Sequence, residues 1–123
     1  MTDRVWLLIG SIYGFVAVAL GAFGAHALKE RLSAEMLSVW RTAVEYQFYH
    51  ALALLLVGVL SRQMPSATLN AAGLCFTVGV LLFSGSLYVL ALSDVSVFGA
   101  ITPFGGILFL AGWALLVWTA SEA

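Results

Sequence analysis

Long stretches without charge decide what this chain can fold into. Residues 5–28, 63–93 and 95–120 contain no Asp, Glu, Lys or Arg, and a shorter uncharged run covers residues 46–61. A helix needs about 20 mainly apolar residues to cross the roughly 30 Å of bilayer hydrocarbon. The pattern therefore predicts four transmembrane helices, at about residues 5–27, 42–61, 69–92 and 101–120.

Composition supports a place in the membrane and excludes some partners. Hydrophobic residues make up 63% of the 123 residues, charged residues make up 9%, and the mean hydropathy is +1.06. A soluble domain of this size could not bury so much apolar surface. The formal net charge of −1, without a cluster of Lys or Arg, argues against a nucleic-acid partner. We expect one transmembrane domain over residues 1–123, folded as an all-α antiparallel four-helix bundle in the lipid bilayer.

The segments between the predicted spans are short, so successive helices should be antiparallel neighbours with both termini on one side of the membrane. Residues 29–41 are polar, with apolar positions at amphipathic spacing. We expect a short amphipathic helix there, lying at the interface, capped by Ser33 and leading into the second span. Lys and Arg are divided too evenly between the two ends to decide the orientation.

The first span carries a stripe of small residues on one helical face: Gly10, Gly14, Ala17, Gly21, Gly24 and Ala25. Such a stripe lets a neighbouring helix approach closely, which is how helices pack in lipid. We expect this span to be the central helix of the bundle. Three glycines of the fourth span, Gly105, Gly106 and Gly112, are expected to pack against its small face.

One group of polar residues near the start of the second span could carry chemistry. Arg41, Glu45 and Tyr49 follow one another at i, i+4 steps and share a helical face, and Tyr46 and His50 form the next stripe. The pattern indicates a polar site at one membrane boundary.

His26 ends the first span on the side where the second begins, so we expect the two histidines at similar depth. An acid, phenols and imidazoles could relay a proton, hold a metal or ligate a haem. The structural alternative is interfacial tyrosines, an ordinary helix ion pair and a histidine bonded to loop carbonyls. Two histidines without a thiol or carboxylate cluster are too few for a closed zinc site, so we expect no resident metal or cofactor.

A second polar group, Ser84, Ser86 and Tyr88, lies late in the third span, and Thr102 and Pro103 open the fourth, with Thr102 as its cap. Serines in membrane helices commonly bond to their own backbone or to a neighbouring helix, so packing is favoured over substrate binding. The Walker, dinucleotide-binding, G-x-S-x-G and HExxH motifs are absent, and we expect no catalytic residue.

Four motifs follow one another over nearly the whole chain: residues 20–28 (LGAFGAHAL), 46–54 (YQFYHALAL), 84–88 (SGSLY) and 101–106 (ITPFGG). Together they resemble the YgdD/YwdK-like family of small inner-membrane proteins of unknown function, which is similar to eukaryotic transmembrane protein 256. The resemblance implies a four-span, multi-pass protein of the bacterial inner membrane and no established activity. Any shared site would use residues in or beside these motifs: His26, Glu45, Tyr46, His50, Ser86, Tyr88, Thr102 and Pro103.

Three functional hypotheses remain. The first is a non-enzymatic accessory or interaction subunit, which binds a larger membrane complex or further copies of itself. The second is a small oligomeric channel or transporter with a polar mouth at His26, Glu45 and His50. The third is a haem- or quinone-binding protein that uses the two histidines. Small size, short loops and more apolar surface than four helices need to bury one another favour the first.

Overall fold

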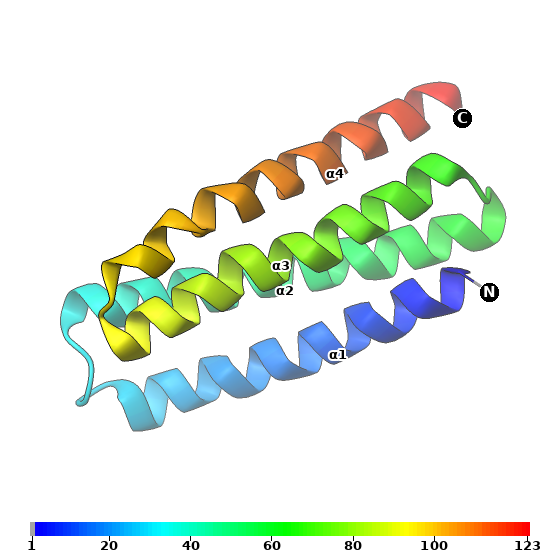
Figure 1. Ribbon diagram of the computed structural model, residues 1–123. Helices are drawn as coiled ribbons and strands as arrows, with labels where there is room; N and C mark the ends of the chain where they lie inside the picture. The colour runs from blue at the N-terminus through cyan, green and yellow to red at the C-terminus, as the bar shows by residue number, and fades with distance from the viewer. Residues whose placement is uncertain (1) are drawn as a thin grey trace.

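The computed structural model describes residues 2–123 as four long helices joined by short turns, with no strand among those residues (Figure 1). In chain order the elements are α1 (Thr2–Phe23), a π-helical turn η1 (Gly24–Leu28), α2 (Ala34–Gln63), α3 (Ala67–Ser93), a 3-10 turn η2 (Ser96–Ala100) and α4 (Thr102–Glu122). Four helical segments are long and apolar enough to cross a membrane. The predicted all-α, four-span architecture is confirmed.

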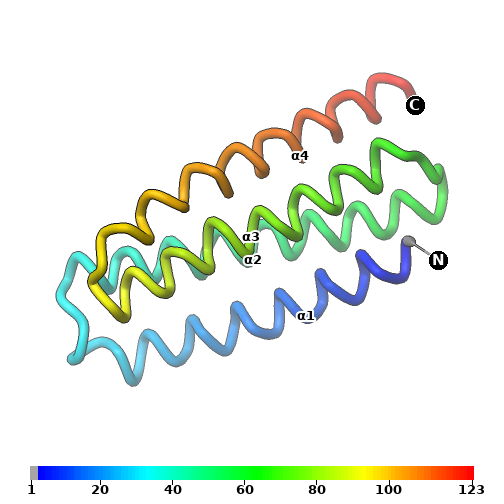
Figure 2. The backbone as a smooth tube through the Cα atoms, viewed as in Figure 1, coloured from blue at the N-terminus to red at the C-terminus, as the bar shows by residue number. Residues whose placement is uncertain are grey.

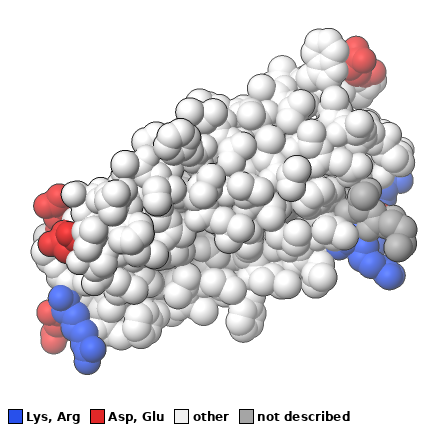
Figure 3. Space-filling view, viewed as in Figure 1, with Lys and Arg blue, Asp and Glu red and all other residues white. Residues whose placement is uncertain are grey.

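The charges and the chain ends fit a bundle that spans the bilayer. Successive helices run in opposite directions, and the two ends of the chain lie at the same end of the bundle (Figure 1). On the face shown in Figure 3, acidic and basic side chains gather at the two ends and leave an uncharged band between them. At the terminal end, Arg62 Nε donates to Asp3 Oδ2 over 2.8 Å. The uncharged band is the part that hydrocarbon would cover.

The two middle helices form the centre of the bundle. α1 packs against α2, and α4 packs against α3, whereas the described backbones of α1 and α4 do not approach each other (Figures 1 and 2). The largest fully buried side chains, among them Phe76 and Leu54, belong to α3 and α2. The expectation that the first span is central is therefore wrong. Its small stripe serves one neighbour, and most of the helix faces outward.

The small stripe of α1 faces α2. A Cβ added to Gly10 would lie 2.9 Å from the carbonyl oxygen of Ala51, and one added to Gly24 would lie 2.5 Å from the indole nitrogen of Trp40. Gly14 differs, because its nearest neighbour, the Ala51 Cβ, would be at an ordinary contact distance of 3.8 Å. The backbone of the first helical segment closely approaches the α2 backbone at Gly10 and the Trp40 side chain at Gly24, and more room is left in the middle of the stripe.

The glycines of α4 pack on α3. A Cβ on Gly105 would collide with the backbone nitrogen of Phe83, and one on Gly112 would lie 2.5 Å from the ring of Phe76. A Cβ on Gly106 would meet only the edge of the Phe83 ring, at 4.0 Å. The expected contact between these glycines and the small face of α1 is wrong, because α1 and α4 lie on opposite sides of the α2–α3 pair.

The second helix is longer than predicted. It begins at Ala34 rather than near residue 42, and the Ser33 side chain caps it by accepting from the Met36 backbone N–H at 3.1 Å. Leu37 and Trp40 are buried against neighbouring helices. The apolar positions that predicted a separate interfacial helix are thus the first turns of α2, and the described residues between η1 and α2 form a turn.

Replacing Gly105 by alanine should destabilise the bundle, because the new Cβ meets the backbone of Phe83, which cannot rotate away. We expect a loss of about 1–3 kcal/mol in the free energy of unfolding, measured by denaturation in detergent micelles. Gly85→Ala is the matched control, because a Cβ on Gly85 has no atom within 4 Å and alanine favours a helix over glycine. Equal unfolding free energies for the two variants would contradict the packing of α4 on α3.

Candidate functional site

The structure separates the predicted site residues into an inward set and an outward set. The inward set lies at helix–helix contacts: His50, Ser84, Ser86, Tyr88 and Thr102. The outward set lies on the exposed face of α2: Arg41, Glu45 and Tyr49. The Tyr46 side chain borders both sets, and His26 stands apart on η1. The boundary site that the spacing predicted is therefore not one constellation.

The inward face is organised by a residue that the sequence analysis did not select. Gln47 is 4% exposed, and its amide links three helices. The Nε2 donates to the carbonyl oxygen of Tyr13 in α1 over 2.9 Å, and the Oε1 accepts from the Tyr88 hydroxyl of α3 over 2.7 Å. A lone amide among the apolar residues of a membrane span is itself a signal, because it must find partners within the protein.

His50 is a packing residue with both ring nitrogens engaged. Its ring stacks on Phe109 of α4, with centroids 3.6 Å apart and planes at 4°. Its Nε2 lies 3.1 Å from the Trp113 indole nitrogen, and its Nδ1 lies 2.7 Å from the carbonyl oxygen of Tyr46. An indole N–H can only donate, so Nε2 accepts and Nδ1 carries the proton that is donated to Tyr46. Neither nitrogen is left to ligate a metal or a haem iron.

The serines of α3 hold helices together. The Ser84 hydroxyl donates to the carbonyl oxygen of Ala43 in α2 over 2.7 Å, and it is fully buried. The Ser86 and Thr102 hydroxyls lie 2.6 Å apart and join α3 to α4. Thr102 is the first residue of α4 and makes no capping hydrogen bond, so its predicted role as N-cap is wrong. Its hydroxyl is directed to the neighbouring helix instead.

The two histidines lie at different depths. Gly24, close to His26, packs on Trp40, whereas Ala51, beside His50, packs on Gly10. Along α2 the separation between Trp40 and His50 corresponds to about 15 Å. The expectation of similar depth is wrong because α2 starts earlier than predicted, which moves His50 towards the middle of the span. His26 is exposed near the end of the bundle.

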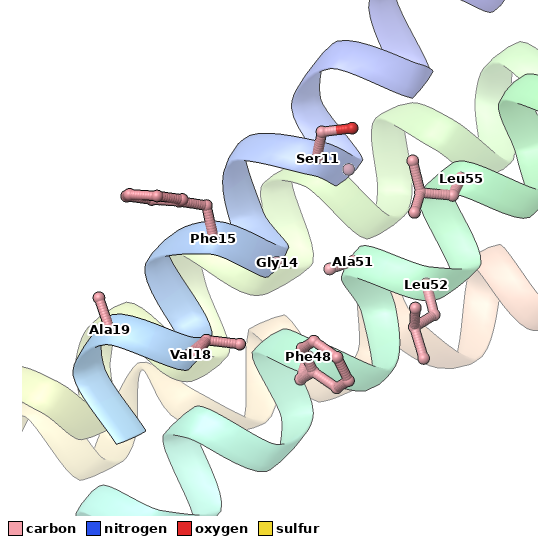
Figure 4. Close-up of a pocket in the computed structure, with 10 residues that line it drawn as sticks. Ser11, Gly14, Phe15, Val18, Ala19, Phe48, Ala51, Leu52 and Leu55 are labelled. Carbon is pink, nitrogen blue, oxygen red and sulfur yellow. The ribbon is translucent and has the colours of Figure 1, made fainter. Parts of the chain in front are cut away.

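The outward set lines a groove between α1 and α2, which we call the α1/α2 groove. It consists of three adjoining hollows of about 460, 500 and 260 Å³. Figure 4 shows the first, with Ser11, Gly14, Phe15, Val18 and Ala19 of α1 opposite Phe48, Ala51, Leu52 and Leu55 of α2. The other two hollows share Gly21, Val44 and Glu45 in their walls. The groove is apolar except near Glu45.

Glu45 is the chemically unusual residue of this groove. It lies roughly 17 Å from the start of α2, a helix of 30 residues and so about 45 Å long, and hydrocarbon of roughly 30 Å centred on that helix would reach it. Its carboxylate accepts from the Tyr49 hydroxyl over 3.4 Å, and the described residues show no ion pair between it and Arg41. A charged side chain facing lipid costs up to about 3 kcal/mol at the bilayer centre. An acid exposed at that depth is expected to have a polar or protein partner that shields it from lipid.

The arrangement as a whole offers little to a metal. Among the described residues no three His, Cys, Asp or Glu side chains come close enough to form a metal site. The inward polar groups bond to protein atoms, and the outward ones border an open groove. The groove presents three polar groups to a molecule that packs against α1 and α2: the carboxyl group of Glu45, the phenol of Tyr49 and the guanidinium of Arg41.

Replacing Gln47 by leucine or Tyr88 by phenylalanine should each lower the free energy of unfolding by about 1 kcal/mol, because each leaves a buried polar atom without its partner. The double variant should cost less than the sum of the two, as expected for groups that bond to each other. Detergent unfolding measures all three. Tyr49→Phe, which removes only the long outward contact to Glu45, is the control and should change stability least. Strict additivity would sink the assignment of this hydrogen bond.

A family profile described as a protein of unknown function (DUF423) matches residues 20–106. The chain is 47% identical to a UPF0382 membrane protein of Staphylococcus saprophyticus, over 93% of this chain and 94% of that protein. It is 42% identical to the UPF0382 membrane protein YwdK of Bacillus subtilis, over 93% and 94%. It is 44% identical to the UPF0382 inner membrane protein YgdD of Escherichia coli K12, over 95% and 89%.

No solved structure matches the chain. The relatives are named as membrane proteins, which agrees with the four membrane-spanning helices. The resemblance drawn from the four sequence motifs is confirmed by both the family profile and the relatives. The chain belongs to the DUF423 (UPF0382) family of membrane proteins of unknown function.

Proposed function

We propose that this protein is a non-enzymatic interaction subunit of the bacterial inner membrane, which binds a transmembrane helix in the α1/α2 groove. The observation that carries the proposal is the outward position of Glu45 in that groove, at a depth where lipid offers it no partner. Ionisable residues within membrane spans almost always face protein or a water-filled cavity. A protein helix against the groove would supply the missing surroundings.

The shape of the groove supports a helix as the occupant. Small side chains of α1 border it, and a Cβ on Gly14 would stand at an ordinary contact distance of 3.8 Å from the Ala51 Cβ without a clash. Small residues let two helix backbones approach closely, and that approach supplies the van der Waals contact that drives association in lipid. The occupant must also bring a cationic group or a hydrogen-bond donor to the depth of Glu45.

The interior supports a structural role for the inward set. His50, Gln47 and Ser84 each bond to protein atoms of a neighbouring helix, so the centre of the bundle is held together by the same residues that a cofactor would need. A haem or quinone site built on the two histidines has no geometric support, because they lie about 15 Å apart in depth.

Filling the groove should break the proposed association. Gly14→Leu puts a bulky side chain into the first hollow, and its Cβ would stand at an ordinary contact distance of 3.8 Å from the Ala51 Cβ. We expect the assembly that the tagged wild-type protein forms in mild detergent to fall by about tenfold or more in this variant, the loss that corresponds to about 1.4 kcal/mol of binding. Native gel electrophoresis and native mass spectrometry measure it.

Gly106→Leu is the matched control for this experiment. Gly106 is also a half-buried glycine of a membrane helix with only a loose neighbour, but it lies on α4, away from the groove. It should leave the assembly intact. A wild-type protein that stays a bare monomer in native membranes after cross-linking, or equal behaviour of the two variants, would falsify the proposed function.

A further inference from the structure

We infer that the α1/α2 groove closes against the same groove of a second copy of this chain, with Arg41 of each copy paired to Glu45 of the other. The inference rests on the proposed function and names its partner. The charges of the groove and its shape are both self-complementary under a two-fold axis.

The groove carries one acid and one base in a fixed relation. Arg41 and Glu45 both line its third hollow, and both side chains are exposed. They stand one helical turn apart on the same face of α2, and they form no ion pair within the described chain. The acid lies within the hydrocarbon and the base lies nearer the membrane surface. A surface with one charge of each sign can complement a copy of itself.

A two-fold axis along the membrane normal brings each residue to the same depth as its counterpart. A contact of this type is isologous, so a pair between residue i of one copy and residue j of the other occurs twice. Arg41 has a long side chain that can cover the rise of about 6 Å between its own level and that of Glu45. Each carboxylate then meets a guanidinium, whose fork fits it in a bidentate way.

The shape of the groove is also complementary to a second copy of itself. Phe15 projects outward from α1 at the edge of the groove, with 79% of its surface exposed (Figure 4). Next to it lies the first hollow, of about 460 Å³, which also borders Gly14 and Phe48. In a two-fold pair, Phe15 of one copy stands opposite the hollow of the other, and the contact repeats by symmetry. A projecting ring beside a hollow is the knob-and-hole relation that packs helices.

Other occupants satisfy only part of this surface. A lipid acyl chain could fill the apolar hollows, but it offers nothing to Glu45. An unrelated helix with a single cation could pair with Glu45, but it would leave Arg41 without a carboxylate. A second copy supplies the cation, the acid, the knob and the hollow together.

Cysteine cross-linking tests the contact in native membranes. The Cys75→Ser background removes the one native thiol, which lies on α3. In that background, Ala22→Cys places a thiol in the groove beside Glu45, and Ile107→Cys places one on the outer face of α4 at 62% exposure. With a short bis-maleimide, we expect a covalent dimer of the first variant and at least about tenfold less of the second.

A charge exchange between two co-expressed chains tests the pairing itself. Glu45→Arg and Arg41→Glu should each reduce the Ala22→Cys cross-link by about fivefold or more, because each brings like charges together across the interface. When the two variants are expressed together with different tags, cross-links between the tags should recover to near the wild-type yield. A pair within one chain would not be restored in this way, because each chain still carries two like charges. Recovery also demonstrates that both variant chains insert and fold.

The outcomes separate this inference from the proposed function. Groove cross-links between copies, with recovery by charge exchange, establish it. Dimers that do not recover in the exchange overturn the Arg41–Glu45 pairing. Groove thiols that give no covalent dimer, while a wild-type assembly with a different protein is lost in Gly14→Leu, overturn the second copy and leave the proposed function standing. Groove thiols that give no covalent dimer, with no assembly that Gly14→Leu reduces, overturn both.

Discussion

The structure depends on one constraint: within the hydrocarbon, a polar group must find its partner inside the protein. Gln47 shows how the bundle meets it, since one amide takes a hydroxyl from α3 and donates to a carbonyl of α1. His50 meets it with an indole from α4 and a carbonyl of its own helix. Among the described side chains, the buried Ser61 hydroxyl, near the end of α2, is the exception that lacks a partner. Hydrogen bonds that cross between helices therefore fix their relative rotation.

The same constraint is left unmet on the opposite face of α2. There the Glu45 carboxylate has a phenol at 3.4 Å and an apolar groove around it. A bundle that satisfies Gln47, His50 and Ser84 so fully has no structural need for a carboxylate on its outer surface. The Glu45 carboxylate makes no hydrogen bond to another helix among the described residues. Under the proposed function its partner belongs to another helix, and fold and function would then use two faces of α2.

The existence of the spans could be predicted from sequence, but the depth of the site could not. Uncharged length is a one-dimensional property, and it located the four helices because lipid tolerates few charges. It placed the start of α2 too late, because Arg41 interrupts the apolar run. The amphipathic spacing of residues 29–41 could not correct this, since burial against a bundle and burial in an interface select the same periodicity. Because the start of α2 was placed too late, His26 and His50 were predicted to lie at similar depth.

Neighbour choice was the other feature that the sequence could not determine. A stripe of glycines specifies close approach without saying which helix approaches, and Gly105 found Phe83 of α3 rather than α1. The chemical type of a side chain was also a poor guide to its role. Histidines attract attention as ligands, yet in a dry interior a neutral imidazole is a flat ring with one donor and one acceptor, which is how His50 is used. The i, i+4 Arg41–Glu45 pair, ordinary on a soluble helix, is the more informative signal in a span. An ionisable side chain within a membrane span costs solvation free energy, so its presence indicates that a polar partner lies close to it.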